Sequence, residues 1–375
     1  MRQLFADKRL LVCVGSGGVG KTTSAASIAL AGAMAGRRAL VLTIDPARRL
    51  ANSLGLTEIG NTEHRIVLDE PVFGQRVTGE LWAMMLDAPS TFDDVIRRVA
   101  RDPATRDAIF GNRIYRSIAG SFSGSQEYMA TERLFDVVQS GRYDLVVLDT
   151  PPVKNALDFL DAPGRLSRFL DKQVMKRLIA PENDDGGGLF GSRLLAGTTA
   201  VVYRLLGHIF GAEFLSEIAA FFSLFRDLYD GFRERHEAVE KMFAAPTTAF
   251  VVVAAPTEPS MEVAGFFFNE LRARKLPLAG LVVNQVHQAQ YETPDVEQLL
   301  GEQARQFDSV AAAPLLARLE SAHGRLRALA AVEAKRVAEL RKQAGAGVTV
   351  RVVPRFAAAV HDLAGLASLH RFLVG

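Results

Sequence analysis

A glycine-rich loop near the N-terminus has the residue types and the spacing that bind phosphate. Residues 15–23 read GSGGVGKTT and fit the pattern G-x-x-x-x-G-K-[ST]. In such a loop the backbone N–H groups point at phosphate oxygens, and the N-terminus of the next helix adds partial positive charge. Lys21 would reach the β- and γ-phosphates, and the Thr22 hydroxyl would contact Mg²⁺. The loop therefore predicts nucleotide binding.

The residues on either side of this loop provide the context that such a site needs. An apolar strand is expected at Leu10–Val14, and a helix of small residues is expected from Ser24 to Ala35. Glycine is required in the loop because a Cβ atom would clash with a closely approaching phosphate or forbid the backbone angle. Strand, loop and helix in this order favour a phosphate site over a purely structural turn.

Two aspartates follow predicted strands and could act beside the phosphates. Asp45, in the segment Thr-Ile-Asp-Pro, could orient the attacking water or accept its proton. It could also cap the following helix, with Pro46 at the first helical position, and both roles can hold together. Asp149 ends a second apolar strand, as expected of a carboxylate that holds Mg²⁺; a plain strand-end turn is the alternative. Thr150 and the prolines after it could sense the γ-phosphate.

Continuous apolar runs bounded by turn residues recur along the chain and predict buried parallel strands. Helical segments separate most of them, which indicates βα units and an α/β fold. We expect a doubly wound, mostly parallel sheet of the P-loop NTPase type with an inserted helical subdomain. The predicted strands are Leu10–Val14, Ala39–Ile44, Leu81–Leu86, Leu145–Leu148, Ala249–Val253, Leu281–Val283 and Val348–Val353.

The chain is long for a minimal nucleotide-binding domain, and helical patterns account for the excess. We predict one ATPase domain over residues 1–375 with helical insertions at about 90–140 and 154–242. The second insertion contains a glycine tract with adjacent acids, which predicts a flexible loop. A block at about 294–343 has helical spacing with Pro314 well inside it, which predicts a helical hairpin.

Composition excludes several classes of protein. The 44 Lys and Arg nearly balance the 42 Asp and Glu, so no nucleic-acid partner is expected. The single cysteine, Cys13, excludes an intrachain disulfide framework or a cysteine-built zinc site and reads as a small core residue. No signal peptide is evident, and no apolar run is long enough to span a bilayer. We therefore expect no integral membrane segment and a cytoplasmic location.

The order of the motifs is more specific than any one of them. A loop written GGVGKTT, an Asp-Pro-Ala at Asp45, an Asp-Thr-Pro-Pro at Asp149 and a late Val-Val-Asn-Gln at 282–285 follow one another. In this the chain resembles the arsenite-pump (ArsA) and tail-anchored-protein-targeting (Get/TRC) ATPases. These are deviant-Walker P-loop proteins related to the MinD and ParA partitioning ATPases.

The resemblance implies roles for particular residues of this chain. Lys21 and Asp45 would be catalytic, with Asp45 acting on the attacking water. Thr22 and Asp149 would hold Mg²⁺. Asn284 would read adenine through its amide. The residues implied to bind ATP are Gly17, Gly18, Val19, Gly20, Lys21, Thr22, Thr23, Asn284, Pro354 and Phe356, the last two from a loop that closes over the adenine.

Three departures from the family pattern bear on function. The deviant-Walker class places a lysine second in the loop, where it reaches the partner's phosphates, and this chain has Ser16 there. Arg48 or Arg49 could replace the missing cation, or a different partner subunit could supply it. The targeting ATPases often close their dimer with zinc on paired cysteines, but this chain has no cysteine after Asn284. The arsenite pump binds its ligand through cysteines that also have no counterpart here, so arsenite is not expected as a ligand.

The implied function is a Mg²⁺-dependent ATPase that couples ATP binding and hydrolysis to conformational change in a dimer. The dimer could be of like chains or pair with a paralogous subunit, acting on a membrane-protein client or a permease. Phe214, Ile218, Phe221, Phe225 and Leu228 would share one helical face, which could line a client groove or pack in the core. The alternatives are the energising subunit of an anion transporter and a MinD/ParA-like positioning or regulatory ATPase.

Overall fold

The structure is a computed structural model of the 375-residue chain. It describes residues 7–44, 49–56, 60, 62–68, 77–86, 93, 96–97, 100, 102–118, 125–151, 212–288, 309–357, 360 and 362–374.

Contacts divide the chain into two compact units. The first comprises Met1–Met85, Arg142–Val153 and Ala244–Gly375, and the second comprises Leu86–Gly141 and Lys154–Phe243. The prediction of one ATPase domain carrying helical insertions stays a prediction.

The first unit is built on an eight-stranded sheet in the order β3-β4-β2-β5-β1-β6-β7-β8. All neighbouring pairs are parallel except β3 with β4, which are antiparallel. The strands are β1 (Leu10–Gly15), β2 (Arg38–Thr43), β3 (His64–Ile66), β4 (Glu80–Met85), β5 (Leu145–Asp149), β6 (Thr248–Ala254), β7 (Leu278–Val286) and β8 (Thr349–Pro354). The predicted α/β class and mostly parallel sheet are confirmed.

Each of the seven predicted strands corresponds to an observed one, with shifts of a few residues at the ends. The sequence pattern missed β3, whose first two residues are exposed and only Ile66 is buried. A short edge strand of this kind lacks the continuous apolar run that marks a strand covered on both faces.

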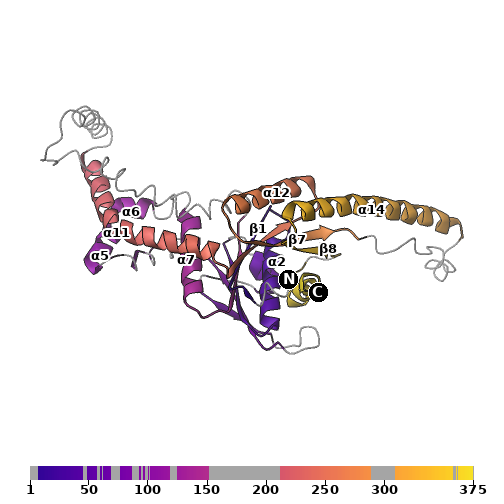
Figure 1. The fold of residues 1–375 in the computed structure, drawn as a ribbon, viewed down its shortest axis with the longest axis horizontal. Coiled ribbons are helices and arrows are strands. Elements are labelled where there is room, and N and C mark those ends of the chain that lie inside the picture. Colours follow the sequence, from indigo (N-terminus) through magenta and orange to yellow (C-terminus); the bar gives the residue numbers. More distant parts are fainter. Residues whose placement is uncertain are drawn as a thin grey trace. The chain divides into compact units, whose positions relative to one another are not determined.

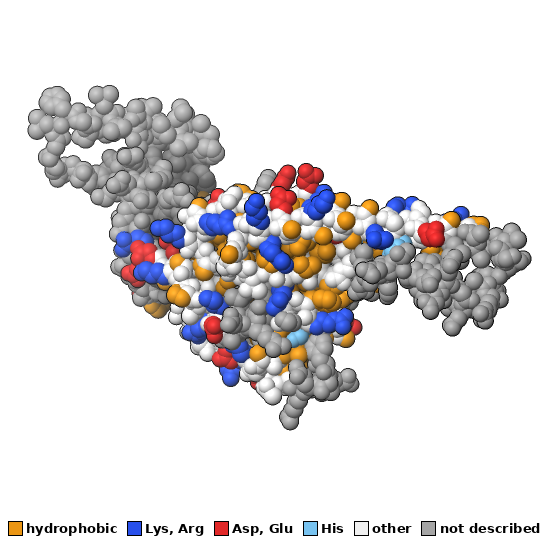
Figure 2. Space-filling view, turned by 45° about the vertical axis from the view of Figure 1, so that its right-hand side comes forward, with side chains coloured by type: hydrophobic (Ala, Val, Ile, Leu, Met, Phe, Trp, Pro, Cys, Tyr) orange, Lys and Arg blue, Asp and Glu red, His pale blue; other side chains and the backbone are white. Residues whose placement is uncertain are grey.

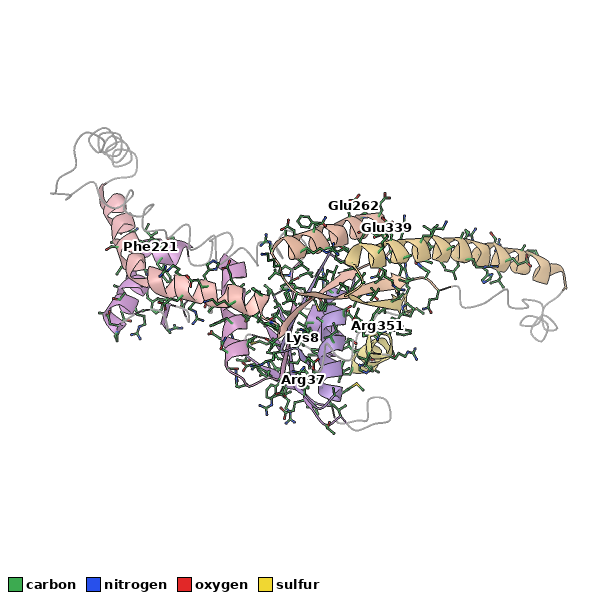
Figure 3. All side chains as sticks on the ribbon, viewed as in Figure 1. Lys8, Arg37, Phe221, Glu262, Glu339 and Arg351 are labelled. Carbon is green, nitrogen blue, oxygen red and sulfur yellow. The ribbon has the colours of Figure 1, made fainter. Side chains whose placement is uncertain are left out.

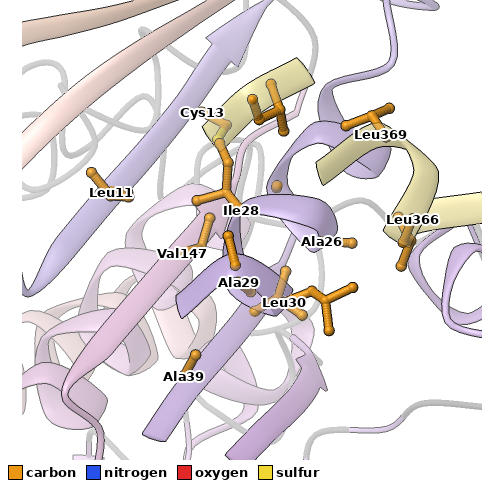
Figure 4. Packing of buried hydrophobic residues seen from close by; sticks show 14 of the residues in the cluster. Leu11, Cys13, Ala26, Ile28, Ala29, Leu30, Ala39, Val147, Leu366 and Leu369 are labelled. Carbon is orange, nitrogen blue, oxygen red and sulfur yellow. The ribbon is translucent and has the colours of Figure 1, made fainter. Parts of the chain in front are cut away.

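Among the described residues, two helices cover one face of the sheet. Helix α2 (Lys21–Met34) lies against the central strands, and α15 (Leu363–Val374) packs on α2 and β8. Alternate residues of each strand face them, so that Leu11 and Cys13 join the cluster formed with Ile28 of α2 and Leu366 of α15 (Figure 4). The small side chains of α2 let the helix approach the sheet closely.

The opposite face packs against α12 (Glu258–Ala273) and α14 (Ser309–Ala344), which lie side by side (Figure 1). Phe267 and Phe268 of α12 and Leu340 of α14 are fully buried there. Helices therefore lie on both faces of the sheet, as in a doubly wound fold.

The described part of the block at 294–343 differs from the predicted hairpin. Residues 309–344 form one helix that contains Pro314, so the proline does not separate two helices as we expected. Pro314 is the sixth residue of α14, so the helix continues through it without the hydrogen bond that an N–H at this position would donate to residue 310. The remainder of the predicted hairpin, 294–308, lies outside the described residues.

The described part of the second unit is helical. It contains α5 (Pro103–Gly111), α6 (Arg113–Ile118), α7 (Ser125–Gln139) and nearly all of α11 (Ala212–Ala244). Asp102 caps α5 by accepting a hydrogen bond from Thr105 N at 2.9 Å. Arg235 of α11 binds the carboxylates of Glu132 and Asp136 on α7, which fixes the two helices to each other.

The predicted phenylalanine face lies on α11, and the structure describes only part of it. Phe221 is buried, at 4% exposure (Figure 3). The side chains of Phe214, Ile218, Phe225 and Leu228 lie outside the described residues, so the client groove stays a prediction. Among the helices that the structure describes, none is long and apolar enough to cross a membrane.

Charged side chains of the described residues are spread over the face seen in Figure 2. Lys and Arg lie there among hydrophobic and uncharged surface, in keeping with the balanced composition.

Candidate nucleotide-binding site

The glycine loop lies between the C-terminal end of β1 and the N-terminus of α2, at the centre of the sheet. Gly15 passes so close to β6 that a Cβ atom would lie 2.1 Å from the carbonyl oxygen of Val253. Gly20 adopts a left-handed conformation with φ of 88°, and no side chain caps the helix that it precedes. The first N–H groups of α2 are therefore available to a bound anion.

Thr22 and Asp149 bring a hydroxyl and a carboxylate together beneath the loop. The Thr22 hydroxyl donates to Asp149 Oδ2 at 2.7 Å, and the Thr43 hydroxyl donates to the same oxygen at 3.0 Å. Asp149 is fully buried and Thr22 is 9% exposed. Hard oxygen donors of these two kinds are what Mg²⁺ prefers, so the donor set fits this ion.

Lys21 and Thr150 are also fixed at this end of the sheet. The ammonium group of Lys21 donates to the carbonyl oxygen of Ser16 at 3.1 Å, and the lysine is 7% exposed. The hydroxyl of Thr150 donates to the carbonyl oxygen of Cys13 at 2.7 Å. The thiol of Cys13 lies beneath them, and burial, followed by the negative charge of Asp149, raises its pKa.

A cavity of about 630 Å³ opens beside the loop. Its polar lining includes the cations Lys21, Arg49 and Arg355, which suit an anionic ligand. The lining also includes the apolar side chains of Pro354, Phe356, Val360 and Leu369. Phe356 is supported by Phe372, with ring centroids 6.0 Å apart in an edge-to-face arrangement. A cavity lined by both basic and apolar residues suits the phosphates and the base of a nucleotide.

Two amides at the end of β7 hold the loop from the side. Asn284 Nδ2 donates to the carbonyl oxygen of Val19 at 2.8 Å, and Gln285 Nε2 donates to that of Gly18 at 3.1 Å. Both amides also line the cavity. Asn284 thus anchors the loop in this structure, and its reading of adenine stays a prediction.

Ser16, which occupies the position of the family's lysine, is bonded within its own chain. Its hydroxyl donates to the hydroxyl of Ser260 at 3.1 Å, and Ser260 accepts from the backbone N–H of Ala255 at 2.9 Å. Ser260 is buried in the first turn of α12. This bond joins the loop to the end of β6.

The structure brings most of the predicted site residues together. Gly18, Gly20, Lys21, Thr22, Thr23, Asn284, Pro354 and Phe356 all line the cavity. Asp149 lies buried behind Thr22, Gly17 is exposed, and the Val19 side chain belongs to the core. Asp45 lies outside the described residues, as does Arg48.

Sequence reasoning assigned no role to several residues of the site. Asn52 and Ser53 line the cavity from the short helix α3 (Arg49–Ser53), and Thr43 shares the Asp149 carboxylate. Ser260 could not have been found, because its contact with Ser16 joins residues 244 positions apart in the chain. The one sequence feature that could have pointed to Gln285 is its position directly after Asn284, which was predicted to be a site residue.

Comparison with known proteins agrees with this geometry. Residues 8–189, which include β1, the glycine loop and Asp149, match the family model described as "Anion-transporting ATPase". An ATPase ASNA1 homolog 1 of Paramecium tetraurelia is 25% identical over 276 residues, covering 72% of this chain and 73% of its own length. The ATPase GET3 of Kluyveromyces lactis is 25% identical over 296 residues, covering 75% and 73%.

The chain is similar to the ArsA/Get ATPases over residues 8–189 and, in these relatives, over about three quarters of its length. The ATPase ARSA1 of Chlamydomonas reinhardtii, another relative, is 24% identical over 308 residues, which are 75% of this chain but 35% of that longer protein. This similarity makes the chain an ATP hydrolase that uses ATP. The resemblance seen in the four motifs is thereby confirmed.

Proposed function

We propose that this ATPase uses Mg²⁺, works as a dimer in the cytoplasm and couples ATP binding and hydrolysis to a conformational change that acts on a membrane-related client. The observation that carries the magnesium part is the Thr22–Asp149 contact of 2.7 Å, which joins a hydroxyl and a buried carboxylate behind the phosphate loop. When bound, Mg²⁺ would neutralise charge on the phosphate oxygens and hold them in place.

The residues of the chain would then divide the work of phosphoryl transfer. Backbone N–H groups at the start of α2 and the ammonium of Lys21 would stabilise the charge on the phosphates. Asp45 would orient the attacking water and accept its proton. Pro354 and Phe356 would pack against the base. Catalysis would rest on positioning and electrostatic stabilisation, with no covalent intermediate.

The dimer proposal rests on the resemblance and on what Ser16 lacks. A hydroxyl bonded to Ser260 cannot supply the cation that the deviant-Walker class sends to its partner. Arg49 lines the cavity and could supply it within the chain, or a paralogous subunit could provide it in a mixed dimer.

Turnover of the purified chain over a wide range of protein concentration, with Mg²⁺ and with EDTA, tests these points. Specific activity that rises with concentration and requires Mg²⁺ supports a dimer of like chains. ATP binding with negligible turnover at every concentration contradicts a self-sufficient dimer and supports a paralogous partner. Lys21→Ala is the control, because it should lose ATP binding while its thermal unfolding stays like that of the natural chain.

The client is tested separately with a synthetic apolar helix that carries a photo-crosslinking group. Crosslinks to α11 that depend on the bound nucleotide support a membrane-related client. Crosslinks that are absent in the ATP-bound, ADP-bound and nucleotide-free chains contradict it.

A further inference from the structure

One turn of α14 contacts the ends of two strands at once. The Glu333 carboxylate accepts a hydrogen bond from the backbone N–H of His287 at 2.7 Å, and its other oxygen lies 2.9 Å from His287 Nδ1. Arg336, three positions further along the helix, donates to the carbonyl oxygen of Pro256 at 3.0 Å. Residues at this spacing share a helix face, so one face of α14 holds both the end of β7 and the end of β6.

These strand ends are the segments that hold the phosphate loop. Gln285, two residues before His287, donates to Gly18, and Asn284 donates to Val19. Pro256 directly follows Ala255, whose N–H group is bonded to the same Ser260 hydroxyl that Ser16 contacts. Hydrogen bonds therefore hold the loop from two sides, one set from the end of β7 and one from Ser260. Each set lies within a few residues of a contact to α14.

The β7 end is held in a backbone conformation that needs support. Gln285 has a φ of 62°, which a residue with a side chain adopts at a cost of about 1 kcal/mol or more. His287, whose N–H donates to Glu333, lies two residues after Gln285, and Arg355 N–H donates to the carbonyl oxygen of Val286 between them at 2.9 Å. Glu333 is 5% exposed. Burying a carboxylate is costly unless hydrogen bonds compensate for the lost water, and the His287 contacts provide this compensation.

The same helix continues away from these contacts with little cover. Most of residues 317–332 are exposed, including Leu326, Leu329 and Val332 at 38%, 41% and 46%. A helix without packed neighbours opens more readily than one held by tertiary contacts. This exposed stretch is followed by the turn that carries Glu333, which is buried, and Arg336, which is half-buried.

We propose that Glu333 and Arg336 are positioning residues that link the phosphate loop to α14, so that a nucleotide in the loop stabilises the exposed part of that helix. Nucleotide binding tightens the loop against Asn284, Gln285 and Ser260, and the strand ends transmit this to the Glu333 turn. Coupling between two sites is reciprocal, so the factor by which the nucleotide stabilises the turn is also the factor by which loss of the turn weakens nucleotide binding. The inference rests on the proposed function only in taking Mg²⁺-ATP as the ligand.

Hydrogen–deuterium exchange of the amides of residues 317–332, with and without Mg²⁺-ATP, measures the coupling. In the natural chain we expect the nucleotide to slow exchange there several-fold. Glu333→Gln keeps the size of the side chain but replaces one carboxylate oxygen with an NH₂ group, so the side chain no longer faces both His287 N–H and Nδ1 with an oxygen. We expect it to abolish most of that slowing and to weaken ATP binding about three- to tenfold, with a higher KM for ATP.

Two controls separate positioning from general stability. Glu339→Gln removes an exposed carboxylate from the same helix (Figure 3) and should leave both the exchange and the ATP affinity unchanged. Arg336→Gln weakens the β6 contact alone and should reproduce part of the Glu333→Gln effect even if the latter fails to fold. Thermal unfolding of each variant is recorded beside the exchange.

The outcomes are distinct. The inference is overturned if ATP binds to the natural chain without changing exchange in 317–332, or if folded Glu333→Gln and Arg336→Gln respond as Glu339→Gln does. Failure of the natural chain to bind ATP at all contradicts the ligand assignment and the inference together, and direct binding identifies this case.

Discussion

The hydroxyl of Thr22 and the carboxylate of Asp149 lie 2.7 Å apart although 127 positions of sequence separate them. Thr22 is the second residue of α2, and Asp149 is the last residue of β5, the neighbour of β1 in the sheet. The parallel pairing of β1 with β5 thus brings a hydroxyl from the loop and a carboxylate from a strand end to one point, where a magnesium-bound phosphate would be held.

Removing the Thr22 hydroxyl should therefore damage magnesium use before it damages the fold. We expect Thr22→Ala to lower Mg²⁺-dependent ATP turnover about ten- to a hundredfold and to raise the Mg²⁺ concentration for half-maximal rate, since one oxygen donor is lost. Thr22→Ser keeps the hydroxyl and should retain most of the activity. Steady-state rates over a Mg²⁺ titration check this, and equal rates for the Ala and Ser variants would remove Thr22 from the metal site.

Gly20 is constrained from two directions, and its substitution should disturb the loop's anchor. In Gly20→Ala the backbone φ of 88° is unfavourable, and the new Cβ would lie 2.3 Å from Asn284 Nδ2. We expect Asn284 to be pushed off Val19 and ATP affinity to fall at least tenfold. The control is Gly55→Ala, because Gly55 also has a left-handed conformation, with φ of 70°, but no atom lies within 4 Å of the Cβ that alanine would add. Calorimetric titration with ATP compares the two, and similar affinities would contradict the anchoring role.

Cys13 should make the stability of the protein depend on pH in the alkaline range. Burial raises the pKa of this thiol, so the folded chain keeps a proton that the unfolded chain releases above the ordinary thiol pKa of about 8.5. The contribution of the Cys13 thiol to the free energy of unfolding is fully present below about pH 8.5. Above it, the free energy of unfolding falls by about 1.4 kcal/mol per pH unit from this group.

Urea denaturation of the natural chain and of Cys13→Ala between pH 7.5 and 10 measures the Cys13 contribution. The difference in unfolding free energy between the two proteins should shrink as the pH rises, by about 2 kcal/mol at pH 10. A difference that is constant over this range would show that the thiol is not kept protonated by the fold.

In the second unit, Arg235 should be worth more to stability than a surface arginine. It binds Glu132, which is fully buried, and Asp136 at 2.9 Å. Removing one partner of a buried pair leaves an uncompensated charge, so Arg235→Ala should cost about 3 kcal/mol or more. Arg113→Ala is the control, because its pairing with Glu217 is exposed and should be worth less than 1 kcal/mol. Chemical denaturation distinguishes the two, and equal costs would contradict the buried pair.

The local pattern was sufficient to predict the sheet and the loop. Seven strands follow from apolar runs, because a strand covered on both faces must be apolar along its length, and β3 escaped because it is short, polar and at an edge. The glycine loop follows from the narrow set of residues that can approach phosphate closely. The continuity of α14 through Pro314 could not be predicted, because a proline's effect depends on where in the helix it falls.

The chemistry of the site can be read from residue types and their spacing: the loop with Lys21 and Thr22, the strand-end Asp149 and the late Asn284 are all recognisable in this way. The contacts that hold the loop became visible in the folded chain alone. Ser16 is bonded to Ser260, Asn284 to Val19, and Glu333 to the strand end beside Gln285. These contacts join residues far apart in the chain, and a single hydrogen bond between distant residues leaves no periodicity or composition from which it could be read.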